Sequence, residues 1–486
     1  MDVGKGRKMF KDKVIKNILI LQIIGLILGL IFTVYTINDG FEHLRMSWLV
    51  SQGYVPYRDF FEHHHPLLWY VYLPFTILLP HNIMIAFYFS RVFSLAFSVL
   101  MLWVICKIIT RYMGGKDNIP YFLVLILAFF PIWWSFTVLK PEILARPLYF
   151  TGLYLFFRYA ETYKTKYLVW TGLAFTAAFL FIQNIVFSII PLVIPLMYLW
   201  DKKNPHTGKD ILLSSIAPLA IIGVFVALLY FSGAWKNYYE LCWLFNAKLF
   251  SVLHYMSKSL FIYWTLPMIL GLWAWIYQIK HKQSSFYINT IGLLFCCEMI
   301  QRLCTKAIYN HYFTLIFIFI SMLCAPIFAK MRRQFILNVC YIFLAASLVV
   351  SLLCLYTENN LETMEKYRLV NSSPDNTLFI IHFGIVNVWE PKMSYYVMFS
   401  GMAMLDDFMF HRYPDYDINN YLEENKIKYI NHYDDMSNKI GIEEFSRFNV
   451  SDEFFARFNV RKEVQDKYEQ IYKDLWQRKD TIVVEK

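Results

Sequence analysis

Four histidines, four carboxylates and two arginines gather between residues 38 and 66. The stretch directly follows residues 15–37, an apolar run long enough to cross a membrane. Carboxylates and histidines can transfer protons, and arginine binds phosphate or carboxylate through paired hydrogen bonds. An ordinary loop needs no such concentration of ionisable groups. The stretch therefore indicates a membrane-embedded enzyme with a polar substrate.

Asp39 begins the stretch, and two roles are open to it. Aspartate is among the best residues for capping a helix N-terminus, where it contributes about 1 kcal/mol. Phe41, Leu44 and Trp48 recur on one apolar face, so a helix is expected here. The functional alternative is a general base that takes a proton from an attacking hydroxyl or amine.

The second half of the stretch also has a plain structural interpretation. Arg58 and Asp59 could form a local ion pair within a turn. His63–His65 suggest a metal, but neighbouring residues on a helix or strand point in different directions and chelate poorly. We expect instead that one of these histidines binds a phosphate or a carboxylate. No cofactor is firmly predicted, and a divalent metal stays open as an alternative.

Further ionisable residues lie where other apolar runs begin or end. They are Lys140, Glu142, Arg146, Glu298, Arg302, Lys306 and His311. Glu142 with Arg146, and Glu298 with Arg302, are spaced i,i+4 and could be ordinary helix ion pairs. Burying a charge in the bilayer costs at least about 2.5–3.5 kcal/mol, so such groups usually face a cavity or one another.

The elements that must position these residues are membrane helices. Hydrophobic residues make up 58% of the 486 residues and aromatic residues 19%, which excludes a soluble globular protein. A span takes about 20 apolar residues. We expect eleven spans, near 15–37, 83–106, 119–138, 143–159, 167–182, 185–200, 211–231, 260–279, 286–301, 310–329 and 334–355.

The basic residues predict how these spans are oriented. Lysine and arginine are concentrated before the first span and in alternate connections, as is typical of cytoplasmic segments. We expect a multi-pass protein of the plasma (inner) membrane with a cytoplasmic N-terminus. All the candidate site residues then lie on the outer side. This topology explains most of the net charge of +10, so no nucleic-acid partner is predicted.

The motifs together resemble the integral-membrane glycosyltransferases of the GT-C fold. The resemblance is to the bacterial branch akin to protein O-mannosyltransferases and the aminoarabinose transferase of lipid A. Its first outer loop carries an acidic pair, usually Asp-Glu, about fourteen residues before a glycine, and Asp39 precedes Gly53 by fourteen. Residues 56–66 then reproduce its Pro-Tyr-Arg-Asp-Phe-Phe and His-Pro elements. Lys140-Pro141-Glu142 is similar to its Arg-Pro-Glu/Asp element, and residues 309–312 resemble its late His-Tyr element.

The resemblance implies a donor sugar linked to a polyprenyl phosphate and an inverting, direct displacement. Asp39 is then the candidate base. The candidates for binding the phosphate or sugar of the donor are Arg58, Asp59, His63, Lys140, Glu142, Arg146, Arg302, Lys306 and His311. One departure matters, because Gly40 replaces the usual second acid of the Asp-Glu pair. Glu42 is therefore the second catalytic candidate.

Two domains are expected. Residues 1–355 form the α-helical polytopic domain, and residues 356–486 form a small extracytoplasmic α/β domain. In the latter we expect a strand at 377–381, a helix at 419–425 leading into a strand at 426–430, a helix within 442–475 and a closing strand at 481–484.

The expected function is transfer of a hexosyl or pentosyl group from a polyprenyl-phosphate donor to an extracytoplasmic acceptor. The acceptor could be a protein, a lipid or an envelope glycan. The alternative is a transporter or flippase of lipid-linked sugars. Transporters often show repeated halves and ionisable groups near the middle of the bilayer. The ionisable groups of this sequence lie at one interface, which favours the enzyme.

Overall fold

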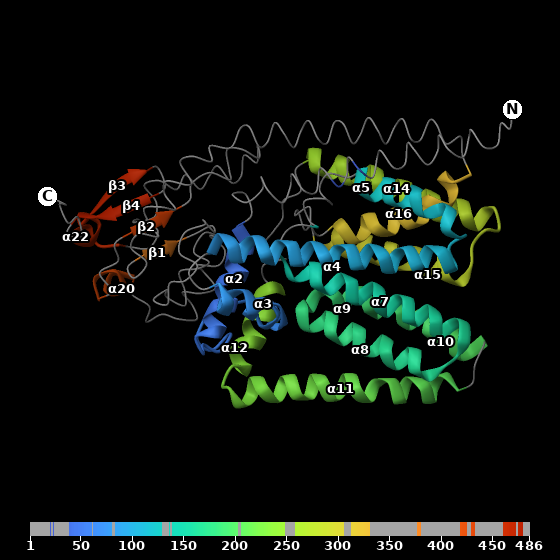
Figure 1. Ribbon diagram of the computed structural model, residues 1–486, viewed down its shortest axis with the longest axis horizontal. Helices are drawn as coiled ribbons and strands as arrows, with labels where there is room; N and C mark the ends of the chain where they lie inside the picture. Colours follow the sequence, from blue (N-terminus) through green and yellow to red (C-terminus); the bar gives the residue numbers. More distant parts are fainter. Residues whose placement is uncertain are drawn as a thin grey trace.

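The protein is predominantly helical in the computed structural model, as expected for a polytopic membrane protein (Figure 1). The structure describes residues 20, 23, 38–60, 62–79, 83–128, 136, 139–202, 206–247, 258–305, 313–330, 377–380, 418–424, 429–432, 460–472 and 475–479. The predicted first and last spans, 15–37 and 334–355, lie outside these residues apart from Ile20 and Ile23.

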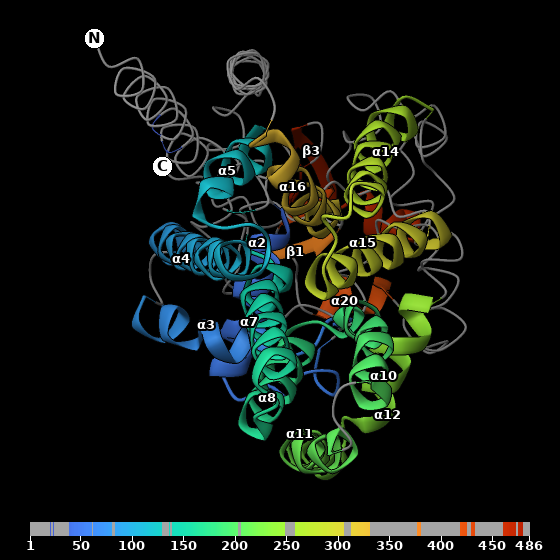
Figure 2. The ribbon, with the colours of Figure 1, turned by 90° about the vertical axis from the view of Figure 1, so that its right-hand side faces the viewer.

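Most of the other predicted spans correspond to single helices of one bundle. These are α4 (Ile83–Tyr112), α5 (Ile119–Ala128), α7 (Pro141–Thr162), α8 (Thr165–Phe181), α11 (Thr207–Phe231), α14 (Lys258–Lys280), α15 (Phe286–Thr305) and α16 (Thr314–Phe328). Figure 2 looks along this bundle, with α11 at one side and α5 and α16 at the other. Among the described residues, three segments are long and apolar enough to cross a membrane: Ile85–Tyr112, Gln183–Asp201 and Thr207–Phe231. The chain is an integral membrane protein.

The predicted span at 185–200 is broken into short pieces. It consists of η3 (Gln183–Ile185), α9 (Val186–Ile189), η4 (Ile190–Leu192) and α10 (Val193–Lys202). Pro191 lies in η4, where its missing N–H removes one hydrogen bond of a continuous helix. The break places polar residues of η3 and α9 beside the ends of α7 and α15.

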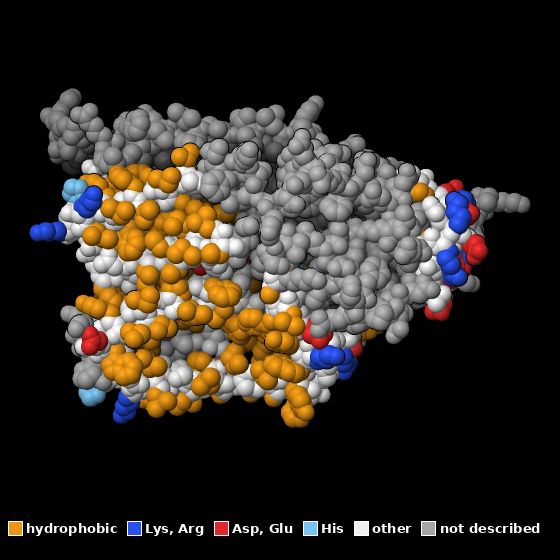
Figure 3. Space-filling view, turned by 180° about the vertical axis from the view of Figure 1, so that it is seen from behind, with side chains coloured by type: hydrophobic (Ala, Val, Ile, Leu, Met, Phe, Trp, Pro, Cys, Tyr) orange, Lys and Arg blue, Asp and Glu red, His pale blue; other side chains and the backbone are white. Residues whose placement is uncertain are grey.

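Charged side chains meet at one end of the bundle. Arg111 at the end of α4 contacts Glu161 near the end of α7, with 2.6 Å between Nη2 and Oε1. Lys330 after α16 donates a 2.8 Å hydrogen bond to Gln283, between α14 and α15. These residues belong to connections predicted to be cytoplasmic, and each contact joins two of these connections. A broad apolar surface separates the two charged ends of the described region (Figure 3).

The helices α7 and α8 pack closely because a glycine lies between them. A Cβ atom added to Gly152 of α7 would lie 2.5 Å from Cε1 of Phe175 in α8. Any larger residue would therefore separate the two helices. This contact joins the middle of α7 to α8.

The predicted first outer loop is largely helical. It forms α2 (Asn38–Ser51) and α3 (Leu67–Leu78), and the sequence analysis did not predict α3. The two helices are joined by the hydroxyl of Ser47, which donates a 2.8 Å hydrogen bond to the carbonyl oxygen of Trp69. With 12 residues, α3 is about 18 Å long and too short to span a bilayer.

The aromatic segment after α11 is also helical where it is described. It forms α12 (Trp235–Tyr239), followed by a π-helical turn, η5 (Glu240–Phe245). π-Helical turns are rare and often occur at functional sites. Here the turn points Cys242 and Asn246 at the loop between α2 and α3.

The C-terminal segment contains a four-stranded sheet in the order β1-β2-β4-β3. Its elements are β1 (Thr377–Ile380), α20 (Ile418–Glu424), β2 (Tyr429–His432), α22 (Lys462–Gln465), β3 (Tyr468–Tyr472) and β4 (Leu475–Arg478). The strands β1 and β2 are parallel, and the other two pairs are antiparallel. Figure 1 shows the sheet at the end of the molecule that also holds α2, α3 and α12.

The α/β character of this segment agrees with the sequence, with one correction. The strand at 377–381 and the helix and strand that follow at 419–430 are found within a few residues of the expected positions. The prediction of a helix within 442–475 is wrong for its C-terminal part, where only α22 is helical and β3 follows. Tyr468, Ile471 and Tyr472 in β3 favour a strand, and pairing with β4 provides its hydrogen bonds. Residues 442–459 and 481–484 lie outside the described residues.

Candidate functional site

Asp39 and Glu42 lie in the first turns of α2, which begins at Asn38. The predicted helix is therefore present, and Asp39 lies within its first turn. Residues three and four apart lie on one side of a helix, so the backbone positions of Glu42 and His43 follow that of Asp39 by one turn. The side chains of Asp39 and Glu42 lie outside the described part of the structure.

Gly40 allows the start of α2 to approach α4 closely. A Cβ atom at Gly40 would lie 2.8 Å from Cε2 of Phe87 in α4 and 3.2 Å from Cβ of Leu139. A glutamate at this position could not be accommodated without moving both neighbours. This contact explains why the acidic pair of the resembling family is interrupted in this sequence.

The loop between α2 and α3 is held through its backbone. The hydroxyl of Tyr57 donates a 2.6 Å hydrogen bond to the carbonyl oxygen of His64. The amides of Gln183 and Asn246 each donate a 2.8 Å hydrogen bond to the carbonyl oxygen of His63. Asn237 of α12 donates one to the carbonyl oxygen of Tyr57. Polar side chains from two distant segments therefore position the loop.

The side chains of this loop surround a buried carboxylate. Glu62 Oε1 accepts a 2.7 Å hydrogen bond from His64 Nδ1 and lies 3.5 Å from His63 Nδ1. The rings of His43 and His64 meet edge to face at 5.3 Å between centroids. Burial alone raises the pKa of Glu62, but the charge and hydrogen bond of His64 outweigh it, so the pKa is lowered. We call His43, Glu62, His63 and His64 the histidine cluster.

His65 plays a different part from its two neighbours. Its Nδ1–H donates a 2.5 Å hydrogen bond to the carbonyl oxygen of Phe179 in α8, and its Nε2 accepts one of 2.9 Å from Tyr238. Burial lowers the pKa of His65 to about 3, so the ring is neutral. His65 therefore joins the loop to α8 and α12. The expectation that neighbouring histidines point in different directions is confirmed for this residue.

Arg58 and Asp59 form the local ion pair considered as the structural alternative. Arg58 Nε and Nη2 donate hydrogen bonds of 2.7 and 2.8 Å to the two oxygens of Asp59. The Asp59 carboxylate also accepts a hydrogen bond from the backbone N–H of Val55, and its hydrogen bond from Arg58 lowers the pKa of Asp59. Arg58 Nη1 reaches the carbonyl oxygen of Ser232 at 3.2 Å. The Arg58 side chain remains 47% exposed, so the pair lies at the surface.

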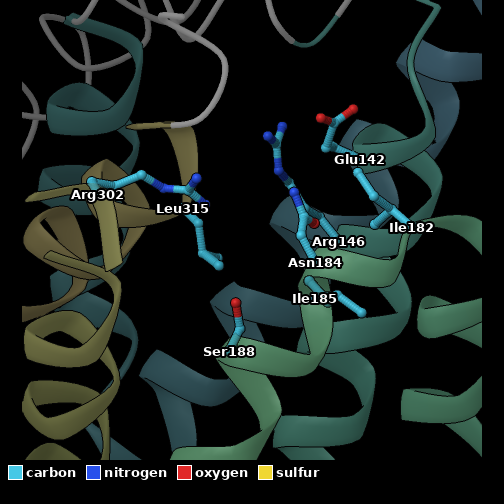
Figure 4. Close-up of a pocket in the computed structure, with 8 residues that line it drawn as sticks. All are labelled: Glu142, Arg146, Ile182, Asn184, Ile185, Ser188, Arg302 and Leu315. Carbon is cyan, nitrogen blue, oxygen red and sulfur yellow. The ribbon is translucent and has the colours of Figure 1, made fainter. Parts of the chain in front are cut away.

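A second polar site lies at the adjoining ends of α7, η3, α9 and α15. A cavity with about 370 Å³ of empty space, part of it open to solvent, is lined by Glu142, Arg146, Ile182, Asn184, Ile185, Ser188, Arg302 and Leu315. Glu142 and Arg146 reach the same side of it, Arg302 comes from across it, and Ser188 lies below (Figure 4). We call this the arginine cavity. It joins three of the predicted site residues from two separate helices.

Both arginines of this cavity are buried against carboxylates. Arg302 Nη2 lies 3.5 Å from Glu298 Oε2, and Ser188 donates a hydrogen bond to the other oxygen of Glu298. Arg146 interacts electrostatically with Glu142, Glu298 and Arg302. The predicted i,i+4 pair of Glu298 and Arg302 is therefore confirmed. The carboxylates of Glu142 and Glu298 offset the charge of the two guanidinium groups, which offer forked hydrogen-bond donors to an anion in the cavity.

Lys140 immediately precedes the first residue of α7. Its side chain is buried and its backbone is extended. Pro141 then occupies the first position of the helix, where its missing N–H leaves no hydrogen bond unmade. The Lys-Pro-Glu sequence thus places a lysine and a glutamate on either side of a helix start. The positive end of the α7 dipole favours Glu142 there.

The predicted site residues are only partly brought together. Glu142, Arg146 and Arg302 share the arginine cavity, whereas His63, Arg58 and Asp59 lie in the loop between α2 and α3. Lys306 and His311 lie outside the described residues.

Gln183 and Asn184 connect the two parts, because Gln183 holds the His63 carbonyl and Asn184 lines the cavity. Neither residue was among the candidate site residues of the sequence analysis. Ser188 was missed because it lies inside an apolar run.

The comparisons with known proteins agree with the sequence motifs. Residues 64–235 match the model of the family described as dolichyl-phosphate-mannose-protein mannosyltransferase. The matched segment runs from the histidine cluster through η3 to the start of α12. It includes Lys140, Glu142 and Arg146. No curated protein matches the chain.

Several solved structures are similar to this chain at low sequence identity. ArnT from Cupriavidus metallidurans bound to undecaprenyl phosphate is 11% identical, with a TM-score of 0.48 over 69% of this chain and 63% of that one. The apo state of the same protein is 11% identical, with a TM-score of 0.45 over 65% and 60%. The oligosaccharyltransferase of Archaeoglobus fulgidus is 13% identical, with a TM-score of 0.43 over 85% and 69%.

The chain thus spans less than two thirds of the ArnT length. Its resemblance to GT-C membrane glycosyltransferases is confirmed by the matched segment. Over residues 64–235 the chain is similar to the model of the dolichyl-phosphate-mannose-protein mannosyltransferase family.

Proposed function

We propose that the protein is an inverting glycosyltransferase that takes a sugar from a polyprenyl-phosphate donor. The acceptor lies on the extracytoplasmic side and is a protein, a lipid or an envelope glycan. The observation that carries this proposal is the pair of buried arginines, Arg146 and Arg302, that face one cavity from different helices. The family match over residues 64–235 supports the class of reaction.

The arginine cavity suits the phosphate of a lipid-linked donor. In the reaction the bond between the sugar and the phosphate breaks, and the departing phosphate gains negative charge. Two arginines in a poorly solvated site stabilise that charge more strongly than they would in water. Lys140 would add a point charge at the start of α7, and Lys306 and His311 are the remaining candidates for the phosphate.

Asp39 is the proposed base on the other side of the reacting carbon. It would take the proton of the acceptor hydroxyl or amine as that atom attacks the sugar. Direct attack opposite to the departing phosphate inverts the anomeric centre. Glu42, one turn further along α2, is proposed as the second carboxylate that the family places beside the base.

The remaining polar residues would bind the sugar and shape the entrance. Glu142, Asn184 and Ser188 line the cavity with groups that accept or donate hydrogen bonds to hydroxyls. Arg58, Asp59 and His63 lie on the loop between α2 and α3, where they would shape the entrance. We assign the transferase to residues 1–355 and regard 356–486 as a separate domain on the same side of the membrane.

The test is release of polyprenyl phosphate from a panel of polyprenyl-phosphate sugars. The purified protein would be placed in nanodiscs with a membrane extract as the source of acceptors. We expect release by the wild type and none by Asp39→Asn, with donor binding nearly unchanged in both. The matched control is Asp117→Asn, which changes a carboxylate near the opposite end of the bundle and should leave release intact.

Two results would overturn the proposal. Absence of binding to every donor would remove the assignment of the arginine cavity. Donor binding without release, combined with movement of the donor across proteoliposome membranes, would identify the transporter alternative. Equal release by Asp39→Asn would instead remove Asp39 from the mechanism.

A further inference from the structure

The histidine cluster has the composition of a metal site and lies apart from the arginine cavity. One ligand atom from each of His43, Glu62 and His64 can be chosen so that all three lie within 4.8 Å of one another. His43 comes from α2, whereas Glu62 and His64 come from the loop before α3. Of the three pairs of ligands, only Glu62 and His64 are close in the sequence. Tertiary folding therefore brings His43 to them.

The carboxylate of this cluster is not fully satisfied by the protein. Glu62 is entirely buried, and its Oε1 accepts hydrogen bonds from two backbone N–H groups and from His64. Its Oε2 has no hydrogen-bond partner among the residues that the structure describes. A buried carboxylate oxygen without a partner is costly, and native structures usually supply a proton donor, a water or a cation.

The donor set and its spacing fit a first-row transition metal. Two imidazoles and one carboxylate are ligands that zinc accepts in sites with one open position. Ligand atoms about 2.1 Å from a tetrahedral zinc ion lie roughly 3.4 Å apart. In the structure the ligand atoms lie within 4.8 Å of one another, so a bound ion would draw them closer together.

The surroundings fix the cluster in place. Hydrogen bonds from Tyr57, Gln183 and Asn246 hold the carbonyl oxygens of His63 and His64. The ring of His63 packs against Phe245 at 5.5 Å between centroids, which holds it beside the cluster. Preorganisation of this kind lowers the entropy that a metal must overcome when it binds.

We propose that His43, Glu62 and His64 bind one divalent transition-metal ion, zinc being the best fit, with a fourth position open to water or a ligand oxygen. The site goes beyond the proposed transfer reaction and does not depend on it. A bound ion would satisfy the Glu62 carboxylate. It would also bring positive charge close to α2 at His43, which follows Asp39 by one helical turn.

The experiment measures metal content and affinity on the full-length protein without an affinity tag, in nanodiscs. The protein is stripped with a chelator, dialysed against zinc and analysed by elemental mass spectrometry. A parallel sample is loaded with Co²⁺ and its visible absorption recorded. We expect one bound zinc per chain and a Co²⁺ spectrum of the intense kind that tetrahedral sites give.

Three variants make the test specific. His64→Gln and Glu62→Gln should each lower zinc affinity by more than roughly tenfold, the lower end of the loss seen when supporting groups of metal sites are removed. His281→Gln alters an exposed histidine at the opposite end of the bundle and should keep both the zinc and the cobalt spectrum. Size-exclusion profiles and thermal unfolding confirm that each variant is folded.

The proposal is overturned if the wild type binds no zinc and no cobalt, or if folded His64→Gln and Glu62→Gln bind both as tightly as the wild type. Binding that is lost in His281→Gln would show adventitious surface binding and would overturn it as well. None of these readouts uses the transfer reaction. A failed metal site and a failed transferase assignment are therefore distinguishable.

Discussion

The side-chain amide of Gln183 donates a 2.8 Å hydrogen bond to the carbonyl oxygen of His63, although 120 residues separate them. The next residue, Asn184, lines the arginine cavity. One short turn, η3, therefore touches both the histidine cluster and the arginine cavity. Because the break in the helix at residues 183–192 creates this turn, the broken span positions the two polar sites relative to each other.

Replacing Gln183 should loosen this connection without unfolding the protein. The His63 carbonyl keeps its hydrogen bond from Asn246, so Gln183→Ala should lower the free energy of unfolding by only about 1 kcal/mol. We expect a larger relative loss in turnover, because the loop is less well positioned. Thermal unfolding and polyprenyl-phosphate release, measured on the same samples, check this. Gln283→Ala, near the other end, should change neither the unfolding nor the release by a comparable amount.

The arginines of the cavity should act as forked donors as well as charges. Arg146→Lys and Arg302→Lys keep the charge but lose the paired hydrogen bonds to a phosphate. Each should raise the KM for the donor roughly tenfold, equivalent to about 1.4 kcal/mol. Steady-state kinetics over a range of donor concentrations measure this. Arg111→Lys is the matched control, since Arg111 pairs with Glu161 at the opposite end. An unchanged KM in both cavity variants would exclude the phosphate from this site.

Lys140 should contribute to donor binding as a point charge. Lys140→Ala removes that charge beside the start of α7 while leaving the proline that opens the helix. We expect a raised apparent KM for the donor with a smaller change in kcat. The control is Lys330→Ala, where the lost amine binds Gln283. If Lys140→Ala and Lys330→Ala have the same KM, Lys140 has no role in donor binding.

Gly40 should tolerate no side chain while Phe87 stays in place. Gly40→Ala puts a Cβ atom 2.8 Å from the Phe87 ring, and overpacking of this kind typically costs about 1–3 kcal/mol. Gly40→Glu, which restores the family's Asp-Glu pair, should be more destabilising still. Thermal unfolding of the two variants and the wild type measures their order of stability. The double variant Gly40→Ala with Phe87→Leu should recover part of the loss, whereas additive losses would show that Phe87 is not the obstacle.

His65 should matter for stability and only indirectly for catalysis. Tyr238→Phe removes the hydrogen bond to His65 and the weaker one that Trp243 Nε1 donates to the Tyr238 hydroxyl, and should cost about 1–2 kcal/mol. His65→Phe removes two and strips the buried Phe179 carbonyl of its His65 donor, so a loss of roughly 2–3 kcal/mol is expected. Denaturant or thermal unfolding in a fixed lipid composition measures both. Tyr239→Phe, at an exposed neighbour of Tyr238, should be close to neutral. A neutral His65→Phe would contradict its structural role.

The sequence predicts the helices well because bilayer-crossing segments must be long and apolar. Apart from α12, the helices from α4 to α16 lie within the predicted spans or extend them. The alternation of basic connections was equally informative, and the contact between Arg111 and Glu161 shows two such connections side by side. Helix α3 was missed for the same reason, since its 12 residues fall below the length that defines a span.

The site was less predictable because its contacts join distant segments. The i,i+4 spacing of Glu298 and Arg302 predicted their pairing, but no local pattern shows that Arg146 faces the same cavity. His43 was noticed only as one more histidine, because its contact with His64 depends on how α2 and α3 pack. Conversely, the bidentate pair of Arg58 and Asp59 could be predicted, since the two residues are adjacent.

Only Thr207, Asp210, Ser214 and Leu229 of α11 are buried, so this helix meets the surrounding lipid with most of its surface. Its 25 residues extend about 37 Å, against a hydrocarbon core of about 30 Å. Helix α11 ends at Phe231, and the next residue, Ser232, accepts the hydrogen bond from Arg58. The thickness of the bilayer and the tilt of α11 therefore set how far above the lipid tails the Arg58–Asp59 pair is held. Membranes of different thickness will hold this loop at different heights above the lipid tails.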